Sequence, residues 1–439
     1  GPAFRDLDSD ALQLIDIILT SGKTSRLYNR LVYKDRIATD VDSYQFAGDI
    51  GGFYYIQASV QPGGDHEAVK SAINDEINRF IEDGPTKAEL RRAKMKLTSG
   101  FIRGTEKVGG FGGKSDILAQ NAVYTGDPGF YKKSLQAIED ANQKSIIAVA
   151  NKWLNKGSYN LEVHPTEKLT YSDNGADRTS LPETKTFPES KFINFERSTL
   201  SNGLELVVAR QKNAAIVNFN LLLDAGYASD QYSVPGTSSL AMSMLDEGTV
   251  KKDALEISDE ASEIGAIISS GSGIDSSSVT LNALRENLDE SLDLYADIIL
   301  NPSFPENELE RLRKQKLAEI QQEKNQPFGI ALRVLPELLY GKNHAYSLPL
   351  TGSGTEESIE KISREQLVEY HERWFKPNNA TMIVVGDVTI EEIKAKLEKL
   401  FKNWVASEVP EKNISPVNNN SQETIYLIDR QGSQQSIVL

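Results

Sequence analysis

Residues 199–223 read TLSNGLELVVARQKNAAIVNFNLLL, and this stretch decides the fold class. The Asn202-Gly203 pair is a strong turn signal between two apolar stretches, so it predicts a β-hairpin whose second strand covers Leu204–Val208. The same reasoning predicts further strands over 217–223 and 278–284, and helices over 288–300 and 306–324. Strands and helices do not alternate strictly. This order favours α+β domains with helices packed on one face of a mainly antiparallel sheet.

A pattern of a capped helix, a tryptophan and a strand occurs twice in the chain. One constant offset pairs Ile138 with Ile359, Asn142 with Ser363, and Trp153 with Trp374. Asn142 and Ser363 suit an N-cap, and Gln366 completes a capping box with Ser363. Strands are then expected over 159–163 and 381–385. Two unrelated amphipathic helices that each end in tryptophan would explain less, so we interpret the chain as two homologous domains.

Two stretches that contain proline among small and polar residues divide the chain. Residues 165–190 contain three prolines among small and charged residues, which predicts a long linker. A second break begins near residue 413, and strands are expected over 424–429 and 435–439 beyond it. We therefore expect a first domain over 1–164, a linker over 165–190, a second domain over 191–412, and a further linker with first strands over 413–439. Because the sequence stops within an expected strand, we interpret it as a piece of a longer protein.

Composition excludes several functions. The chain has 48 basic and 63 acidic residues, a net charge of −15, which disfavours nucleic-acid binding. It contains no run of 18 apolar residues, so no membrane span is expected. Cysteine is absent, which rules out disulfides, thiolate zinc sites and a cysteine nucleophile but leaves the compartment open.

The common catalytic motifs are missing. The four histidines are His66, His164, His344 and His371, and no two are spaced to present a pair to one metal from a helix. We expect each to be a surface or packing residue. A Gly-Lys-Ser sequence at 113–115 resembles the end of a phosphate-binding loop, but Val108 replaces the first glycine and a helix is expected before it. A glycine loop is the better interpretation.

Residues 236–249 read GTSSLAMSMLDEGT and follow the strand at 217–223. Together with the Leu-x-Asn-Gly-Leu opening at 200–204, this segment resembles the insulinase/pitrilysin family of zinc metallopeptidases, the inverted zincins. In that family a similar strand is followed by Gly, His-x-x-Glu-His, Met-Leu and Gly-Thr. The similarity continues through Gly265-Ala266, Asp297–Pro305, Gly386-Asp387 and Phe401–Trp404, and so covers nearly the whole chain.

The catalytic residues of the family are not carried over. By the resemblance, the two zinc-binding histidines fall on Ser239 and Ser243, and the base glutamate falls on Met242. Glu319 alone matches the family's third ligand. The Arg and Tyr that contact substrate in the family fall on Val32 and Thr39. The resemblance therefore implies no catalytic, cofactor-binding or metal-binding residue in this chain.

In long single-chain members of the family, four homologous domains close like a clamshell around a chamber. The resemblance implies that this chain is the non-catalytic central part of such a zinc-dependent metallopeptidase, with residues 1–164 as its second domain, 191–412 as its third and 413–439 leading into its fourth. The resemblance further implies that the parent protein binds zinc and peptide substrates. The partners of this chain would be the missing N- and C-terminal domains of the same protein, or a homologous subunit. The family resemblance also favours an exported or periplasmic location.

An inactive partner or scaffold subunit of a peptidase complex is the alternative, and a binding module of different descent is the remaining possibility. A His-x-x-Glu-His motif upstream in the same reading frame separates the first two readings.

Overall fold

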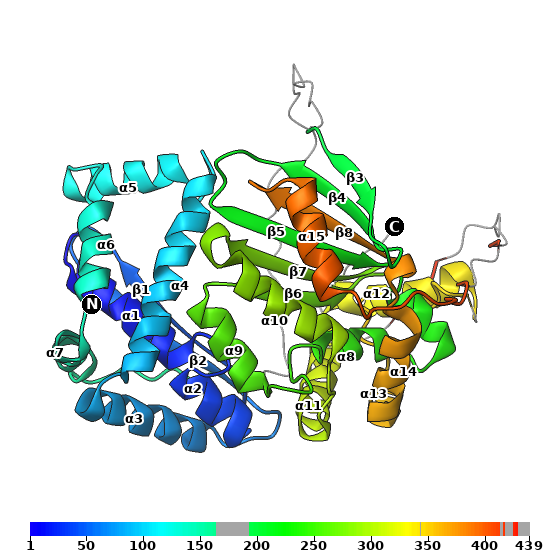
Figure 1. Cartoon of the computed structure of the whole chain (residues 1–439). Helices are drawn as coiled ribbons and strands as arrows, with labels where there is room; N and C mark the ends of the chain where they lie inside the picture. The colour runs from blue at the N-terminus through cyan, green and yellow to red at the C-terminus, as the bar shows by residue number, and fades with distance from the viewer. Residues whose placement is uncertain (164–192, 343, 413–415, 418–424, 429–439) are drawn as a thin grey trace, which may run out of the picture.

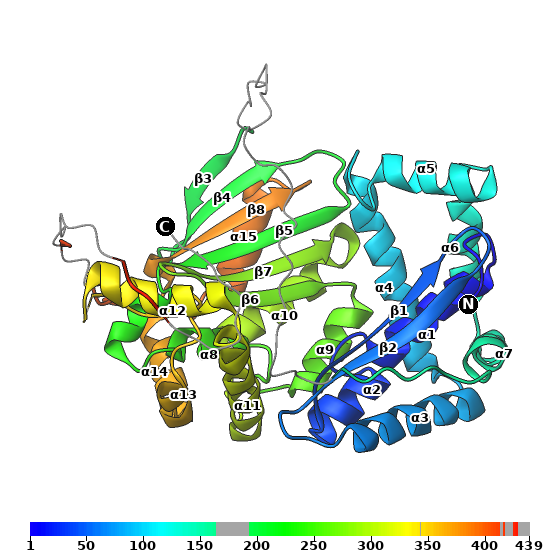
Figure 2. The same ribbon diagram turned by 180° about the vertical axis from the view of Figure 1, so that it is seen from behind.

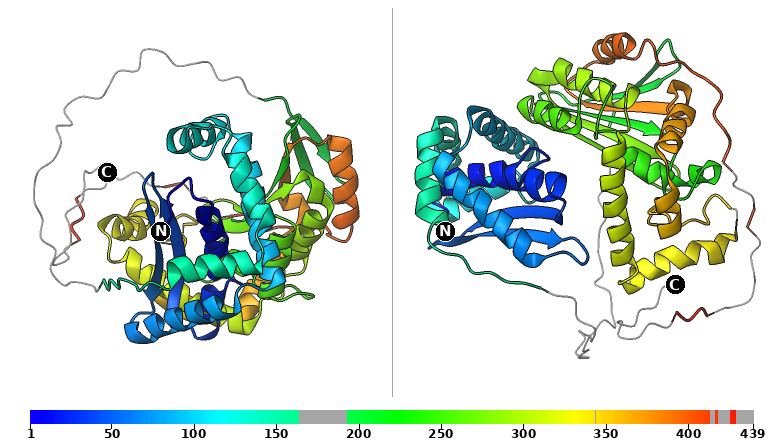
Figure 3. Two further views of the ribbon diagram at one scale, coloured as in Figure 1. Left: turned by 90° about the vertical axis from the view of Figure 1, so that its left-hand side faces the viewer. Right: turned by 90° about the horizontal axis from the view of Figure 1, so that it is seen from below.

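A computed structural model of the chain describes residues 1–163, 193–342, 344–412, 416–417 and 425–428. They form two α+β units, residues 1–163 and residues 193–412, which lie side by side (Figures 1 and 3). The linker expected over 165–190 and the strand expected over 435–439 lie outside the described residues. The domain limits proposed from the sequence therefore stay predictions.

The first unit packs helices on a two-stranded sheet. Its elements are α1 (Asp8–Thr20), α2 (Arg26–Tyr28), η1 (Asn29–Lys34), β1 (Ala38–Ala47), β2 (Gly52–Val60), α3 (His66–Asp83), α4 (Lys87–Glu106), α5 (Lys114–Thr125), α6 (Tyr131–Asp140) and α7 (Gln143–Leu154). Strands β1 and β2 are antiparallel, with Tyr44 opposite Tyr55 and Phe46 opposite Phe53. These four aromatic side chains lie on the face of the sheet that the helices leave exposed.

The second unit contains a six-stranded sheet in the order β3-β4-β8-β5-β7-β6. Its strands are β3 (Glu196–Thr199), β4 (Glu205–Arg210), β5 (Ile216–Leu223), β6 (Ile267–Ser272), β7 (Ser277–Leu284) and β8 (Ala380–Gly386). Only β4 and β8 pair in parallel, so the predicted mainly antiparallel sheet is confirmed. Strands β3 and β4 form the hairpin predicted at Asn202-Gly203, where Gly203 adopts a φ of 94°.

The helices of the second unit pack mainly on one side of this sheet. They are α8 (Thr237–Ser243), α9 (Ala254–Glu263), α10 (Leu288–Leu300), α11 (Glu306–Glu323), α12 (Pro327–Tyr340), α13 (Glu356–Lys361), α14 (Arg364–Trp374) and α15 (Ile390–Leu400), with short turns η2 (Tyr227–Tyr232), η3 (Arg285–Asn287) and η4 (Pro377–Asn379). Figure 2 shows both units from the open side of their sheets, with α1 behind β1 and β2 and with α10 and α15 behind the large sheet.

Local sequence accounts for where several helices begin. The Asn142 side chain accepts a hydrogen bond from the backbone N–H of Ser145, and Gln366 accepts one from the N–H of Ser363, so both predicted N-caps are confirmed. Helix α10 has the predicted bounds, and α11 ends one residue earlier than expected.

Alternating burial builds the core of the second unit. Along β7, every second side chain from Val279 to Ala283 is buried against the helices, while Thr280 and Asn282 face the open side. Phe219, Tyr295 and Trp374 are among the largest fully buried side chains of that core. The first unit has a separate, smaller core between α1, α3, α7 and its two strands.

The two units repeat one arrangement, as the sequence predicted. Helix α14 ends at Trp374 and α7 ends one residue after Trp153, and the β1–β2 hairpin corresponds to the β6–β7 hairpin. Both hairpins have four-residue loops, at 48–51 and 273–276. Residues that lie the same number of positions from the loop therefore correspond between the two hairpins.

Two predicted strands are wrong in the described residues. Residues 159–163 form no strand, and neither do residues 425–428 of the strand expected over 424–429. Both segments are exposed, with Tyr159 at 89% and Leu427 at 89%. An alternating pattern forms a strand only beside a hydrogen-bonding neighbour, and neither segment has one among the described residues.

Ion pairs and hydrogen bonds join the two units. Helix α4 of the first unit packs beside α9 of the second (Figure 1). Its cationic side chains meet acceptors of the second unit: Arg91 pairs with Glu263, Arg92 with Asp259, and Arg103 donates to the backbone oxygen of Gly265. In these contacts the first unit supplies the positive charge and the second the negative charge.

Candidate functional site

Helix α8 carries the positions that align with the zinc motif. It begins after Gly236, and the carboxylate of Asp230 accepts hydrogen bonds from the backbone N–H groups of Gly236 (2.7 Å) and Ser238 (2.9 Å). Asp230 is 2% exposed, and this burial raises its pKa to about 7. A buried side chain therefore fixes the start of the helix.

The aligned side chains are engaged in packing. The Ser239 hydroxyl donates to the backbone oxygen of Gly352 at 2.7 Å, and the Ser243 hydroxyl donates to the backbone oxygen of Ser239 at 3.0 Å. Met242 is fully buried in the core. The loop at Gly352 presses closely on the helix, because a Cβ atom there would lie 3.0 Å from the Ser239 hydroxyl and 2.7 Å from the Tyr227 ring. The loop thus packs against α8 at Ser239, one of the two positions that align with zinc-binding histidines.

The donor set here does not fit zinc. Two hydroxyls and a buried thioether replace two imidazoles and a carboxylate, and neutral hydroxyls are poor zinc ligands. Glu319 lies on α11 with its side chain 47% exposed and pairs with Lys316 at 2.7 Å. In the part of the chain that the structure describes, no group of three or more His, Cys, Asp or Glu side chains is placed to hold a metal ion.

The positions aligned with the substrate-contacting pair are also structural. Val32 is buried in the core of the first unit, and the Thr39 hydroxyl donates to the backbone oxygen of Ser59 across the β1–β2 pair. Neither side chain can stabilise a developing oxyanion in the way an Arg or a Tyr does.

A buried cluster of charges follows directly after the motif segment. Arg311 on α11 lies between Glu247, with 2.7 Å from Nη2 to Oε2, and Glu308, with 2.7 Å from Nε to Oε2. All three side chains are at most 6% exposed. The Nη2–Oε2 contact is a close ion pair rather than an aligned hydrogen bond. Burial alone would lower the pKa of Arg311. The two neighbouring carboxylates outweigh this effect, so the pKa of Arg311 lies above its usual range.

The same cluster ties the two units together. Lys23 of the first unit reaches Glu247 at 3.0 Å and Asp246 at 2.9 Å. The guanidinium of Arg311 also lies 5.8 Å from the ring centre of Tyr33 of the first unit. The segment aligned with the catalytic motif of zinc peptidases, residues 236–249, thus includes two acidic residues that form ion pairs with the first unit.

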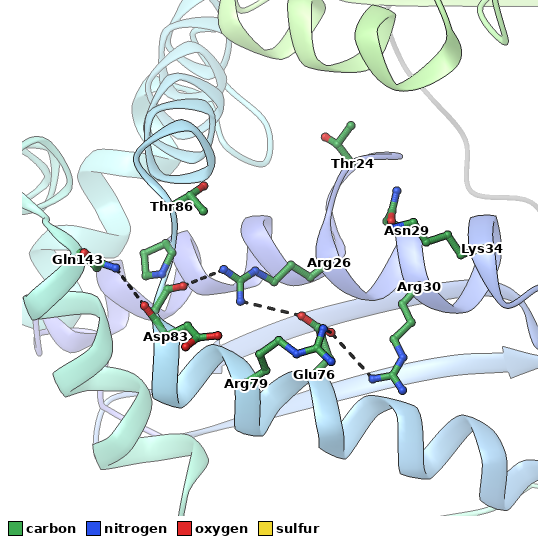
Figure 4. A pocket seen from close by; sticks show the side chains of 12 residues that line it. Thr24, Arg26, Asn29, Arg30, Lys34, Glu76, Arg79, Asp83, Thr86 and Gln143 are labelled. Carbon is green, nitrogen blue, oxygen red and sulfur yellow. Dashed lines mark hydrogen bonds and ion pairs between the residues drawn. The ribbon is translucent and has the colours of Figure 1, made fainter.

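A cavity of about 510 Å³ lies in the first unit (Figure 4). Arg26, Arg30 and Arg79 line it, and each has an acidic partner: Arg26 binds Glu89 with 2.7 Å from Nε to Oε1, Arg30 reaches Asp75 at 3.2 Å, and Arg79 donates to the buried Glu76 at 3.2 Å. Burial by itself would raise the pKa of Glu89, but its hydrogen bonds with Arg26 hold it below the usual range. These pairs fasten α2 and η1 to α3 and α4, and their charges are largely neutralised within the protein.

His371, His344 and the glycine loop take structural roles. The His371 ring stacks on Phe375 with ring centres 4.3 Å apart, and its Nε2 lies 2.8 Å from the backbone oxygen of Ile299. His344 stacks on Tyr340. The glycine loop at 109–113 forms a turn between α4 and α5, in which Gly110 and Gly112 adopt positive φ, and Lys114 begins α5; a helix precedes the loop, as expected. His164 lies outside the described residues.

His371 should make stability depend on pH. Burial lowers its pKa from 6.5 to about 4, so between these pH values the unfolded chain binds more protons than the folded chain. We expect stability to fall as the pH is lowered from about 6.5 to about 4. Urea midpoints at pH 4.5 and pH 7 test this, with His371→Gln as the comparison. The variant should show a smaller difference between the two midpoints, and an unchanged difference would contradict the assignment.

Two family models match this chain. The model described as "Peptidase M16 inactive domain" matches residues 1–97 and 361–439, and the model described as "Insulinase (Peptidase family M16)" matches residues 206–352. The second range contains α8 and Glu319. The chain belongs to the insulinase family, peptidase family M16.

The M16 chain is similar to several curated proteins over part of their length. A protein of Rickettsia felis named "Uncharacterized zinc protease" is 25% identical over 247 residues, which cover 55% of this chain and 59% of the relative. A "Probable mitochondrial-processing peptidase subunit beta" of Arabidopsis thaliana is 25% identical over 205 residues, or 46% of this chain and 38% of the relative. The M16 chain spans about half the length of the bacterial zinc proteases it matches first.

A solved structure is also similar. The crystal structure of a peptidase M16 inactive domain from Pseudomonas fluorescens shares 24% identity, with a TM-score of 0.48, over 51% of this chain and 54% of that chain.

Sequence reasoning missed the charge cluster of the M16 chain. Glu308 and Arg311 are three residues apart on a predicted helix, a spacing that suggests an ion pair. The spacing does not reveal that both are buried, nor that Glu247 and Lys23 join them from distant segments. In the described part of the M16 chain, no helix is long and apolar enough to cross a membrane.

Proposed function

We propose that this chain forms the non-catalytic central part of a larger zinc-dependent M16 peptidase that hydrolyses peptides inside a clamshell chamber. The observation that carries the proposal is the state of α8: Ser239 is bonded to the Gly352 loop, and Met242 is part of the core. A helix packed in this way contributes stability to its domain and cannot hold a metal-bound water.

The chain's own residues then supply structure to the parent enzyme. The sheets of the two units expose their open faces to the same side of the chain (Figure 2). One face is aromatic, at Tyr44 and Tyr55, and the other is polar, at Thr280 and Asn282. We propose that these faces form part of a chamber wall and that the ionic contact at Lys23 and Arg311 holds the wall together.

The alternative is an inactive partner or scaffold subunit. The same loss of the motif in α8 is compatible with it, because a subunit that only binds peptides or protein needs no zinc. The sign that separates the two is a His-x-x-Glu-His motif elsewhere in the complete gene product.

The test compares this chain with the complete gene product. Zinc content and the hydrolysis of a fluorogenic peptide library are measured for both, with and without a chelator. We expect the chain alone to hold no stoichiometric zinc and to cleave nothing, and the complete product to lose its activity with the chelator. A complete product that binds peptides but never cleaves them would favour the alternative, and zinc-dependent cleavage by the chain alone would overturn both.

Restoring the family motif in α8 should not restore a zinc site. The triple variant Ser239→His, Met242→Glu and Ser243→His places a carboxylate at a fully buried position and an imidazole where the Gly352 loop packs. We expect a lower melting temperature, no increase on adding zinc, and no peptidase activity. Met242→Leu, which roughly conserves volume, is the control and should melt near the wild type. A zinc-dependent rise in melting temperature of the triple variant would show that the loop yields.

A further inference from the structure

Gly1 forms backbone hydrogen bonds with the outer edge of strand β2, the edge that faces away from β1. The amino group of Gly1 donates to the backbone oxygen of Gly52 at 2.7 Å, and the N–H of Gly52 donates to the oxygen of Gly1 at 3.1 Å. Two residues that exchange both hydrogen bonds form a hydrogen-bonded pair of an antiparallel ladder. Gly1 therefore sits where a third strand would end.

Farther along this edge of β2, more backbone N–H and C=O groups point outward, where another strand could pair with them. Because hydrogen-bonded positions alternate along an antiparallel strand, the backbone groups of Tyr54, Ile56 and Ala58 point to the outer edge, and those of Phe53 and Tyr55 point toward β1. Within the described residues the sheet of the first unit has two strands. A two-stranded sheet is marginally stable by itself, and an open edge with apolar neighbours invites another strand.

The second unit shows what fills the equivalent place. Gly52 and Ser277 are the first paired residues after the two matching hairpin turns. Ser277 pairs with Leu223, the last residue of β5, so Gly1 occupies the place of Leu223. Strand β5 lies between β7 and β8 and runs antiparallel to both.

The segment equivalent to β8 also lacks a neighbour. The offset that pairs Trp153 with Trp374 aligns Tyr159, Leu161 and Val163 with Ala380, Met382 and Val384, and these last three are buried in β8. In the first unit the aligned side chains are 89%, 74% and 79% exposed. An alternating apolar segment this exposed matches a strand whose sheet is missing beside it.

We propose that one further strand of the same polypeptide, running into Gly1, lies between β2 and residues 159–163 and is antiparallel to both. It would pair with Tyr54, Ile56 and Ala58 through backbone hydrogen bonds and carry apolar side chains on the helix side. The inference rests on the proposed function only in treating the chain as part of a longer protein. The direct connection from β5 into the segment before α8 favours a strand of the same polypeptide over one from a partner.

Amide hydrogen exchange gives the first test. The chain is compared with a version extended by the roughly ten residues that its gene encodes directly before Gly1, a common strand length. We expect exchange at Tyr54, Ile56 and Ala58 to slow by about tenfold on extension, the factor that one added hydrogen bond supplies. Exchange at Phe53 and Tyr55, which already bond to β1, should change little and serves as the internal control.

A disulfide trap fixes the register. The chain has no cysteine, so any disulfide must come from the introduced pair. Tyr55 lies three positions beyond Gly52 along β2, so its partner is the third residue before Gly1. Cysteine at that residue should form a disulfide with Tyr55→Cys, because side chains at such non-hydrogen-bonded pairs approach closely enough. Tyr44→Cys is the matched control: it lies directly opposite Tyr55 on the same face, at 51% against 41% exposure, but one strand farther away.

Equal trapping at Tyr55→Cys and Tyr44→Cys, or unchanged exchange at the outward amides, would overturn the proposal. Slowed exchange that appears only when a separate homologous chain is added would overturn its assignment to the same polypeptide. Neither outcome depends on zinc content or peptide cleavage, so failure here is distinguishable from failure of the proposed function.

Discussion

Replacing Arg311 with methionine should lower the free energy of unfolding by about 3–5 kcal/mol. The substitution leaves Glu247 and Glu308 buried, at 4% and 3% side-chain exposure, with their shared cation removed. Lys23 still reaches Glu247, but no other cation is paired with Glu308 among the described ion pairs. The cost therefore comes from an uncompensated buried charge rather than from the loss of one favourable contact.

Urea unfolding followed by tryptophan fluorescence measures this effect. The matched control is Arg91→Met, which removes another ion pair between the two units, with Glu263. Arg91 is 65% exposed and Glu263 38%, so water already screens the pair and the expected loss is under about 1 kcal/mol. Equal losses for the two variants would mean that the Arg311 cluster is hydrated. Replacing all three members of the cluster by apolar residues of similar volume should recover much of the stability.

Truncating Trp374 to alanine should cost about 3–5 kcal/mol. Its side chain lies in the core of the second unit and is 2% exposed, and its ring lies 6.0 Å from that of Tyr232 at the edge of this core. Truncation leaves a large cavity that the surrounding sheet and helices can close only in part.

The internal duplication supplies the control for this prediction. Trp153 occupies the equivalent position in the first unit, but it is only half-buried and its indole N–H bonds to Asp8 near the surface. We expect Trp153→Ala to cost about 1 kcal/mol. Thermal unfolding of both variants, followed by circular dichroism, compares them. A loss for Trp153→Ala as large as that for Trp374→Ala would show that the core around Trp153 is as complete as that of the second unit.

Sequence patterns were sufficient for the local structure. The turn at Asn202-Gly203, the strand predicted over 217–223 and the caps at Asn142 and Ser363 depend on residues close together in the chain. The structure confirms all of them, with the strand beginning one residue earlier, at Ile216. The duplication was also visible, because its matched residues keep one spacing.

What the sequence could not show depends on distant neighbours. Residues 159–163 alternate like β8, but a strand forms only where other strands lie beside it. The place of β8 between β4 and β5 joins segments more than 150 residues apart. Likewise, nothing in the sequence indicates that Arg311 and Glu247, 64 residues apart, meet in a buried cluster.

The packing of Met242 has an evolutionary consequence. An active site must keep polar groups exposed and imperfectly packed, at a cost in stability, and a domain released from catalysis is free to remove that cost. Met242 of the motif helix is buried, and Ser239 is bonded to the Gly352 loop. At a position packed like that of Met242, selection would favour apolar side chains of similar volume. A single step back toward a ligand set would be destabilising and would bring no activity, so natural selection would remove it before a second step could follow. Under the proposed function, the packing of this helix would keep the domain from regaining a zinc site one residue at a time.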